Sequence, residues 1–554
     1  MRWIQSGKKK DDTKAYKIPG GLTPGKQIIL KGRVSNGTTW FPINFCENEE
    51  FGNGDTLFHF NPRPNDGVVV RNSHIDGSWG PEEREQPHFP FDNGKSFSVR
   101  IDVTAEKFIV YVNGKHFVDY AHRLDVQKGE FLILGEGAEY YDVIFLDKPV
   151  MPYITKIPNG MSVGKVFRIR GMCTSDVGFS VNFMDDGGKY YFHFNPRPQA
   201  GCVVRNANFG DWGGEERDGP GFPFSPFQYF DASFVCMEDK FSVFVNDEHF
   251  TDFNHRDDLT KISVLNLQGN LSIMDVDCSD TKGEESTKEV ESGLEKGDVF
   301  EFQGMMKPDA NRFDINFVNE NGDIAFHFNP RRNEDEVVMN NCEDGAWQSE
   351  ERTGLHPVFK TERPFEVKVE TKKKKFKVFI NGVKFCKFRM RCDVEAIRSI
   401  QIRGDVFILE TLLMKRQDQP IWEGLPTGLQ VGSWITVRGF PKKHWTRFQV
   451  NFMCSGDEDG DIAFHFNPRK DQGEVVRNSR LSEDGDWGPE ETEAPEFPFE
   501  AKDTFEIVFH VGEDKFFTFL NGKNFIEYNH RTSIERICHL CISGDCNFFE
   551  PEIM

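Results

Sequence analysis

HFNPRPNDGVVVRN, residues 59–72, places a histidine, three asparagines and two arginines in a stretch that otherwise resembles a buried β-strand. Nearly the same string returns as HFNPRPQAGCVVRN at 193–206, HFNPRRNEDEVVMN at 327–340 and HFNPRKDQGEVVRN at 465–478. The leading histidines are 134, 134 and 138 residues apart, which is the size of a domain and not of a solenoid repeat. The chain is therefore predicted to contain four units of one kind.

Composition excludes several classes of partner. A net charge of −22 repels phosphate backbones and anionic lipids, so nucleic acid is not expected as a partner. The N-terminal MRWIQSGKKKDD lacks the apolar run of a secretory signal, and no run of about 18 apolar residues is present to insert into a membrane. We therefore expect cytoplasmic synthesis, with any secretion following a route that uses no signal peptide.

The twelve cysteines are distributed one, four, three and four among the units, whereas a disulfide framework should recur with its repeat. We interpret them as reduced thiols. Cys538, Cys541 and Cys546 contain a CxxC spacing that could hold zinc, but no second pair accompanies it.

Alternation of apolar and polar residues predicts strands throughout. KSFSVRIDV and TFEIVFHV alternate, and long stretches with helical periodicity are missing. Asparagine before Gly or Asp, as in VNGKHF and VNDEHF, indicates hairpin turns. Each unit is predicted to be an all-β antiparallel sandwich filled by phenylalanine.

The joints between units divide the chain. We expect an N-terminal tail at 1–13, units at 14–148, 152–278, 297–416 and 421–554, and a flexible charged linker at 279–296. The other joints carry prolines and large apolar residues, so two semi-rigid pairs joined by a hinge are predicted.

The polar residues of the opening string share one face of a strand. Side chains alternate between faces, so Phe58 and Phe60 point to the core while His59, Asn61 and Arg63 point outward. Nine residues after the arginine comes Asn72, a spacing that allows a turn and a return strand. The equivalent residues are His193, Asn195, Arg197 and Asn206; His327, Asn329, Arg331 and Asn340; and His465, Asn467, Arg469 and Asn478.

A second motif, W-x-x-E-x-R, follows in three units and brings an aromatic ring, an acid and an arginine to the same face. Its residues are Trp79, Glu82 and Arg84; Trp212, Glu215 and Arg217; and Trp347, Glu350 and Arg352. The fourth unit has Trp487 and Glu490, but Thr492 in place of the arginine. A ring beside hydrogen-bonding groups suits galactose, since the ring covers the apolar C–H patch and the polar row reads the axial 4-hydroxyl.

An enzyme is an alternative of another class that the residues allow us to test, because Glu82-Glu83 and its equivalents are acid pairs. A glycosidase needs two carboxylates that flank one bond, whereas adjacent strand residues face opposite ways. One acid per groove predicts binding without catalysis.

Together HFNPR, V-x-N, W-x-x-E-x-R and the FPF patch at Phe89–Phe91 resemble the galectin carbohydrate-recognition domain. The resemblance covers the chain four times and implies jelly-roll sandwiches, β-galactoside binding, no metal and no other cofactor. In unit 1 it implies that His59, Asn61 and Arg63 meet the 4-hydroxyl, that Asn72 and Glu82 meet the 6-hydroxyl, and that Trp79 stacks on the ring. Arg63, Glu82 and Arg84 would reach the neighbouring sugar, a contact that Thr492 puts in doubt in unit 4.

The resemblance also implies a multivalent lectin that crosslinks or agglutinates galactose-bearing glycoproteins or glycolipids of host or microbial cells. The eight residues between motif arginine and asparagine look short, so substituted, blood-group-type galactosides are expected to fit. An intracellular protein-interaction scaffold with incidental sugar sites is the alternative that stays open.

Overall fold

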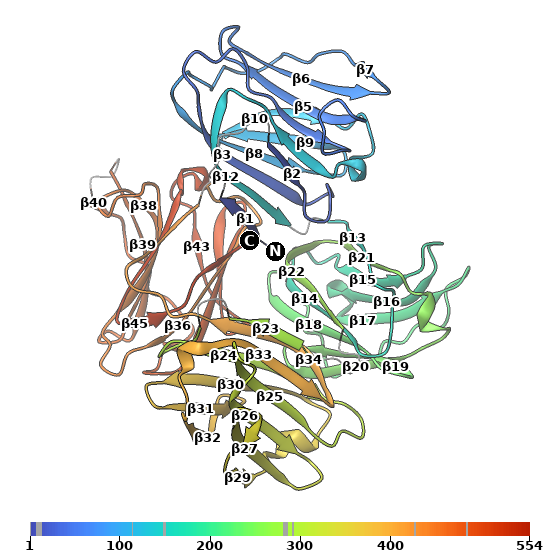
Figure 1. Ribbon diagram of the computed structural model, residues 1–554, viewed down its shortest axis with the longest axis vertical. Coiled ribbons are helices and arrows are strands. Elements are labelled where there is room, and N and C mark those ends of the chain that lie inside the picture. Colours follow the sequence, from blue (N-terminus) through green and yellow to red (C-terminus); the bar gives the residue numbers. More distant parts are fainter. Residues whose placement is uncertain are drawn as a thin grey trace.

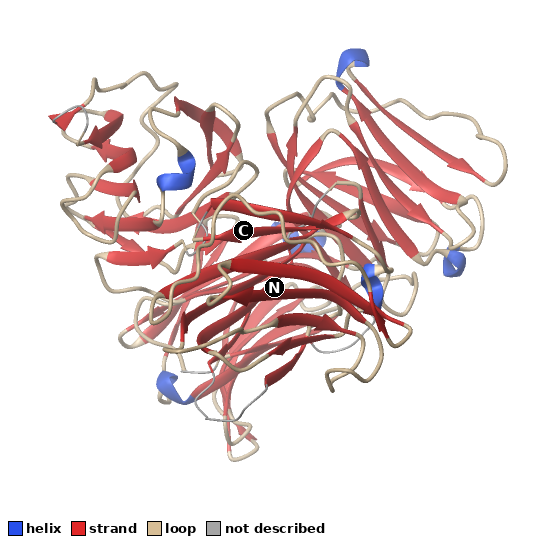
Figure 2. Cartoon of the chain, turned by 90° about the horizontal axis from the view of Figure 1, so that it is seen from above, coloured by secondary structure: helices blue, strands red, loops and turns tan. Residues whose placement is uncertain are grey.

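The computed structural model describes residues 2–6, 14–113, 115–147, 151–280, 286–290, 293–425, 428–482 and 486–554. The chain forms four units of paired antiparallel sheets, coloured from blue to red along the chain (Figure 1), and only short helical turns lie between the strands (Figure 2). No helix in the described ranges is long and apolar enough to cross a membrane.

Unit 1 comprises β1 (Arg2–Ser6), β2 (Lys14–Lys17), β3 (Lys26–Val34), β4 (Ile43–Cys46), β5 (Thr56–Arg63), β6 (Val68–Ile75), β7 (Ser78–Trp79), β8 (Ser96–Val103), β9 (Lys107–Val112), β10 (Lys115–Ala121), η1 (Val126–Lys128), β11 (Phe131–Leu134) and β12 (Ala138–Asp147). Unit 2 comprises β13 (Tyr153–Lys156), β14 (Lys165–Cys173), β15 (Phe179–Met184), β16 (Tyr190–Arg197), η2 (Pro198–Ala200), β17 (Cys202–Asn208), β18 (Tyr229–Cys236), β19 (Lys240–Val245), β20 (Glu248–Asn254), η3 (Leu259–Lys261), β21 (Val264–Gly269) and β22 (Leu271–Asp280).

Unit 3 comprises β23 (Ser286–Glu289), β24 (Val299–Met306), β25 (Phe313–Asn319), β26 (Ile324–Arg331), β27 (Glu336–Glu343), β28 (Ala346–Trp347), β29 (Glu351–Gly354), η4 (Pro357–Lys360), β30 (Pro364–Lys372), β31 (Lys375–Ile380), β32 (Val383–Arg389), η5 (Val394–Ala396), β33 (Ile397–Gly404) and β34 (Val406–Met414). Unit 4 comprises β35 (Ile421–Gly424), β36 (Trp434–Pro441), β37 (Phe448–Met453), β38 (Ile462–Arg469), β39 (Glu474–Leu481), β40 (Asp486–Trp487), β41 (Phe505–Val511), β42 (Lys515–Leu520), β43 (Lys523–Asn529), η6 (Ile534–Arg536), β44 (His539–Gly544), β45 (Cys546–Phe548) and β46 (Glu552–Ile553).

Each unit has a front sheet, which contains the HFNPR strand, and a back sheet. The front sheets run β2-β11-β4-β5-β6-β7, β13-β21-β15-β16-β17, β23-β33-β25-β26-β27-β28 and β35-β44-β37-β38-β39-β40. The back sheets run β1-β12-β3-β8-β9-β10, β20-β19-β18-β14-β22, β32-β31-β30-β24-β34 and β43-β42-β41-β36-β45. This arrangement confirms the predicted all-β sandwiches.

Alternation decides which side chains fill the core between the two sheets. In β30 every second residue is buried, and so is every second residue of β9. Phenylalanines from both sheets meet in the centre, where the Phe58 ring of the front sheet lies 4.7 Å from that of Phe108 in the back sheet. The Asn-Gly turn at Asn381 and Gly382 has the left-handed φ angles of 48° and 73° that asparagine and glycine tolerate.

Units 2, 3 and 4 pack on one another through their back sheets, which lie toward the middle of the molecule in Figure 1. Strand β14 shows the consequence, because all nine of its residues are buried although a sandwich alone covers only one face. The apolar contacts join unit 2 to unit 3 (Val166, Val235, Met237, Phe244, Met305, Phe407 and Leu409), unit 2 to unit 4 (Met172, Tyr229, Met274, Trp434, Val508 and Phe519) and unit 3 to unit 4 (Val299, Met414 and Phe549).

A charged cluster lies where the three back sheets meet. Glu410 of unit 3 forms ion pairs with Arg168 and Arg170 of unit 2, the second at 3.4 Å. Burial alone would raise the pKa of Glu410, but the two guanidinium charges outweigh burial and, with Arg438 of unit 4, lower the pKa to about 2. Glu410 is therefore an anion that bridges the units.

The predicted hinge between two pairs is wrong, since unit 2 packs against units 3 and 4. Of the expected charged linker at 279–296, residues 281–285 and 291–292 lie outside the described residues. Ser286–Glu289 form β23, which pairs with β33, and Val290 and Leu294 are buried in the core of unit 3. Unit 3 thus begins before residue 297. Arg2–Ser6, predicted to be part of a tail, pair with β12, while residues 7–13 lie outside the described residues.

Replacing Glu410 with glutamine should loosen this junction. Arg168 keeps Asp231 and Arg170 keeps Asp275 as partners, but both lose the one carboxylate that joins them to unit 3, at a cost of about 1.5–3 kcal/mol. We expect amide hydrogen exchange of β14 and β34 to accelerate at least tenfold at pH 7. In the unsubstituted protein the contribution is complete above pH 4.5, the ordinary pKa, and is lost as the pH falls toward 2. Unchanged exchange in both strands, compared with the exposed control Glu395→Gln, would refute the role of Glu410.

Candidate functional site

A row of three polar side chains crosses the front sheet of every unit. In unit 1 His59 of β5 lies directly opposite Asn44 of β4 on one side and Asn72 of β6 on the other. The Nδ1 atom of His59 is 2.5 Å from Oδ1 of Asn44. The equivalent pairs, His193 with Asn182, His327 with Asn316 and His465 with Asn451, are each 2.6 Å apart. The predicted return strand is confirmed.

The histidine is held neutral. Burial, followed by the charge of Arg63, lowers the pKa of His59 to about 4, and the same two causes lower the pKa values of His193, His327 and His465 to about 4. A neutral imidazole has one donor and one acceptor. Because Nδ1 donates to the asparagine oxygen, Nε2 is left as an acceptor on the sheet surface.

The asparagine and arginine of HFNPR form a fixed pair in three units. In unit 2 the Asn195 amide donates to the Phe179 carbonyl, at 2.5 Å, and Arg197 Nε donates to Asn195 Oδ1, at 2.7 Å. Units 3 and 4 repeat both bonds. In unit 1 the buried Oδ1 of Asn61 has no hydrogen-bond partner within the described protein, so this unit lacks the bond that fixes the arginine in the other three.

The tryptophan forms the floor of each site. Trp79, Trp212, Trp347 and Trp487 are 42–53% exposed, and their ring centroids lie 4.8–4.9 Å from that of the motif histidine. In unit 1 a short hairpin places the ring, since Trp79 of β7 pairs with His74 of β6. Four exposed rings in one geometry form four equivalent surfaces.

The buried Asn72 ties the tryptophan hairpin to the sheet. Its Nδ2 atom donates to the Gly80 carbonyl, at 2.8 Å, and its Oδ1 accepts from the Ser73 amide and from Arg123. An amide nitrogen carries two N–H donors, so one remains for a ligand. Asn206, Asn340 and Asn478 make the matching bonds to Gly213, Gln348 and Gly488.

The paired glutamates diverge as predicted. Glu82 pairs with Arg84 and lies 3.8 Å from Arg63, whereas Glu83 pairs with Arg123 at 2.7 Å. Each groove therefore receives one of the two carboxylates. The second glutamate of each pair forms an ion pair with an arginine outside the groove. The equivalents of Glu83 and Arg123 are Glu216 with Arg256, Glu351 with Arg391 and Glu491 with Arg531.

Unit 4 lacks the last arginine of W-x-x-E-x-R, and its groove acid pairs differently as a result. In units 1–3 the groove acid pairs with the last arginine of W-x-x-E-x-R and lies 3.7–4.0 Å from the motif arginine. With Thr492 in that position, Glu490 approaches Arg469 to 2.8 Å. The acid therefore changes partner, and Arg469 has one donor fewer for a ligand.

Some residues of the site were missed by sequence reasoning. The histidine partners Asn44, Asn182, Asn316 and Asn451 recur in the string N-F after Ile or Val, so the fourfold repeat of that string could have identified them. Unit 1 also places Phe51 6.4 Å from Trp79, and unit 2 places Tyr190 5.3 Å from Trp212. These rings occur at no common motif position, which is why the sequence did not indicate them.

The alternative zinc site is not assembled. All twelve cysteines are free, and Cys541 and Cys546 are buried in separate apolar clusters of unit 4. In the described part of the chain no group of three His, Cys, Asp or Glu side chains could hold a metal ion.

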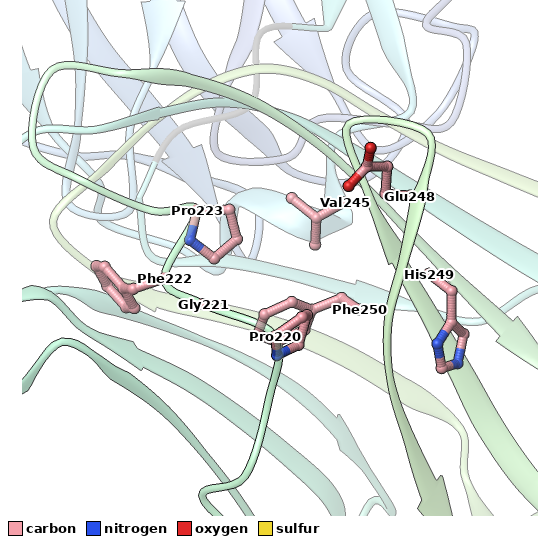
Figure 3. A pocket seen from close by; sticks show the side chains of 8 residues that line it. All are labelled: Pro220, Gly221, Phe222, Pro223, Val245, Glu248, His249 and Phe250. Atoms are coloured by element: carbon pink, nitrogen blue, oxygen red, sulfur yellow. The ribbon is translucent and has the colours of Figure 1, made fainter.

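A cavity of about 240 Å³ in unit 2 lies apart from the row of polar residues. It is lined by Pro220, Gly221, Phe222, Pro223, Val245, Glu248, His249 and Phe250 (Figure 3). Phe222–Phe224 are the unit 2 equivalent of the FPF patch at Phe89–Phe91, and Phe224 is fully buried in the core. The patch is thus mainly structural, and the predicted site residues lie on the open front sheet.

Comparison with known proteins identifies the family of the chain. The galactoside-binding lectin family model matches residues 13–140, 152–278, 285–413 and 420–550. Mouse galectin-6 is 35% identical over 279 residues, which is 46% of this chain and 91% of the relative, and a 32 kDa beta-galactoside-binding lectin of Haemonchus contortus is 33% identical over 264 residues, 46% of this chain and 89% of the relative. Sheep galectin-11, solved in complex with glycerol, aligns with 24% of this chain and 98% of its own at 22% identity and a TM-score of 0.22. The four family matches cover most of the sequence, and the chain belongs to the galactoside-binding lectin family.

Proposed function

We propose that all four front sheets bind β-galactosides and that the protein crosslinks the glycans that carry them. The observation that carries the proposal is the exposed tryptophan held 4.8–4.9 Å from a neutral histidine in every unit. The Haemonchus relative, described as a beta-galactoside-binding lectin, supports the same ligand class.

In unit 1 the proposed contacts are those that the family resemblance implies, and the donors and acceptors of the row support them. Trp79 lies under the apolar C–H face of galactose, and Nε2 of His59 accepts from the axial 4-hydroxyl, which Asn61 and Arg63 also meet. Asn72 and Glu82 meet the 6-hydroxyl, and Arg63, Glu82 and Arg84 reach the next sugar. Glucose lacks the axial hydroxyl, so each group left without its partner costs about 1–3 kcal/mol.

The packing of the units supports crosslinking between separate surfaces. Units 2, 3 and 4 contact one another through their back sheets, so their front sheets face away from the common centre. One flat cell surface therefore cannot meet all three sites, whereas two or three cells or particles can. Galactosides on glycoproteins or glycolipids, of host or microbial origin, are the proposed partners, and agglutination is the proposed activity.

Each site by itself should be weak. A shallow groove exchanges water for a few hydroxyl contacts, which gives a dissociation constant of ~0.1–1 mM. Several sites on one chain raise the avidity by about 10²–10⁴ where glycans are dense. Agglutination is thus the sensitive measure of the number of active sites.

Truncating the tryptophans tests the placement of the sites. Single Trp79→Ala, Trp212→Ala, Trp347→Ala and Trp487→Ala variants should each abolish about one of four lactose sites in calorimetry, since each removes the floor of one site. The quadruple variant should lose agglutination of galactoside-coated beads altogether. Tyr141→Ala, which truncates a comparably exposed aromatic residue in a back sheet, should keep full activity. Agglutination by a folded quadruple variant would contradict the proposal.

The lowered histidine pKa values predict the pH dependence of binding. At pH values above about 5 the four histidines are neutral, so lactose affinity should stay constant from pH 8 to 5.5. Below about pH 4.5 protonation removes the Nε2 acceptor and places a cation beside the motif arginine, and affinity should fall. Calorimetry across this range checks it, and a decline that begins near pH 6.5, the ordinary histidine value, would show that the histidines are not held neutral.

The short turn after the motif arginine supports binding of substituted galactosides. Between β5 and β6 the turn spans only residues 64–67, and a turn this short should open the groove beside galactose. We expect 2- and 3-substituted, blood-group-type galactosides to bind at least as well as N-acetyllactosamine on a glycan array. Uniform preference for the unsubstituted disaccharide would contradict this.

A further inference from the structure

The last arginine of W-x-x-E-x-R is only partly used in unit 2. Nε of Arg217 donates to Glu215 at 2.9 Å, and Nη2 donates to the same carboxylate. The Nη1 atom has no hydrogen-bond partner among the described residues. Arg217 is about half exposed, so this edge of the guanidinium faces solvent at the end of the groove.

In unit 3 the same edge of the equivalent arginine, Arg352, is fully hydrogen-bonded within the protein. Nη2 of Arg352 donates to Glu350 at 2.7 Å, as in unit 2, but Nη1 donates to Glu334 at 2.9 Å and to Glu336 at 2.7 Å. These hydrogen bonds, led by that of Glu336, raise the pKa of Arg352. Glu334 also pairs with the motif arginine, Arg331, at 3.0 Å.

The difference comes from two positions of one hairpin. Glu336 lies directly opposite Arg331 across the sheet, and Cys202 lies in the same register opposite Arg197. Glu334 and Ala200 occupy the third position after their respective arginines. Two arginines thus meet one carboxylate in unit 2 and three carboxylates in unit 3, which reverses the sign of the local charge.

We propose that Glu334 and Glu336 make unit 3 reject galactosides that carry an anionic group on the sugar next to galactose, and that unit 2 accepts them through Arg217. This inference rests on the proposed galactoside binding, in which the two arginines border the neighbouring sugar. An incoming anion finds a free N–H donor in unit 2, whereas in unit 3 it meets carboxylates that already occupy the donors. The protein would then combine sites of different charge preference on one rigid core.

Lactobionate and lactitol form a matched probe pair, because both carry β-linked galactose and differ by a carboxylate against a hydroxymethyl group at the far end. Full-length chains with one active site isolate each unit. Trp79→Ala, Trp347→Ala and Trp487→Ala together leave unit 2 active, and Trp79→Ala, Trp212→Ala and Trp487→Ala together leave unit 3 active. Calorimetry at low salt gives the ratio of the lactobionate affinity to the lactitol affinity for each chain.

We expect that ratio to be about twofold to fivefold higher in the unit 2 chain than in the unit 3 chain, as befits exposed charges. Glu334→Ala with Glu336→Val in the unit 3 chain should raise the ratio by a similar factor, and because each ratio is taken against lactitol on the same chain, an effect of the freed donors on neutral ligands cancels. Ala200→Glu with Cys202→Glu should lower it in the unit 2 chain. Arg312, whose backbone pairs with Arg331, is unchanged in every variant. Glu395→Gln with Glu535→Gln, at two exposed positions, controls for the removal of two negative charges. The differences should shrink in 0.5 M salt.

Equal ratios in units 2 and 3, or ratios that the exchanges do not move, would overturn this inference while lactitol binding upheld the proposed function. Loss of lactitol binding by both folded chains would instead overturn the proposed function itself. The two failures are therefore distinguishable.

Discussion

The hydrogen bond between the motif histidine and the asparagine of the neighbouring strand is the constraint on which each site depends. It fixes the imidazole ring, and burial with the adjacent arginine keeps the ring neutral. The tryptophan packs at a constant distance from that ring, and the asparagine across the other strand anchors the tryptophan hairpin. A substitution of the histidine would therefore displace both the tryptophan ring and the polar side chains beside it.

The front sheet separates what is constant from what varies. The row of asparagine, histidine and asparagine has the same register in all four units, because residues in the middle of a sheet are held on both sides. Variation occurs at the rim, where Phe51, Tyr190, Glu334 and Thr492 each belong to one unit. Recognition of one sugar and discrimination among its substituents are thus carried by different parts of the same sheet.

The sequence predicted the parts of this structure that depend on local alternation. The faces of His59 and Glu82, the return strand of Asn72 and the divergence of Glu82 from Glu83 all follow from a period of two residues. The Asn44 partner was not predicted, since the pairing of β4 with β5 joins residues across a loop of variable length. The swing of Glu490 toward Arg469 depends on a competition between two ion pairs, which spacing alone does not express.

The packing of the units on one another was also not predicted, because it depends on contacts between residues that are far apart in the sequence. Arg168 and Arg170 alternate with apolar residues on β14 just as solvent-facing residues do. Their face is buried by residues more than 100 positions away in the sequence, among them Glu410 of unit 3 and Trp434 of unit 4. The charged stretch at 286–290 likewise reads as a tether, although strand pairing and a single buried valine bind it to unit 3. The back sheets of units 2, 3 and 4 are covered by this packing, so their front sheets are the faces that remain accessible to ligands. The direction in which each of these sites points is therefore set by contacts between units.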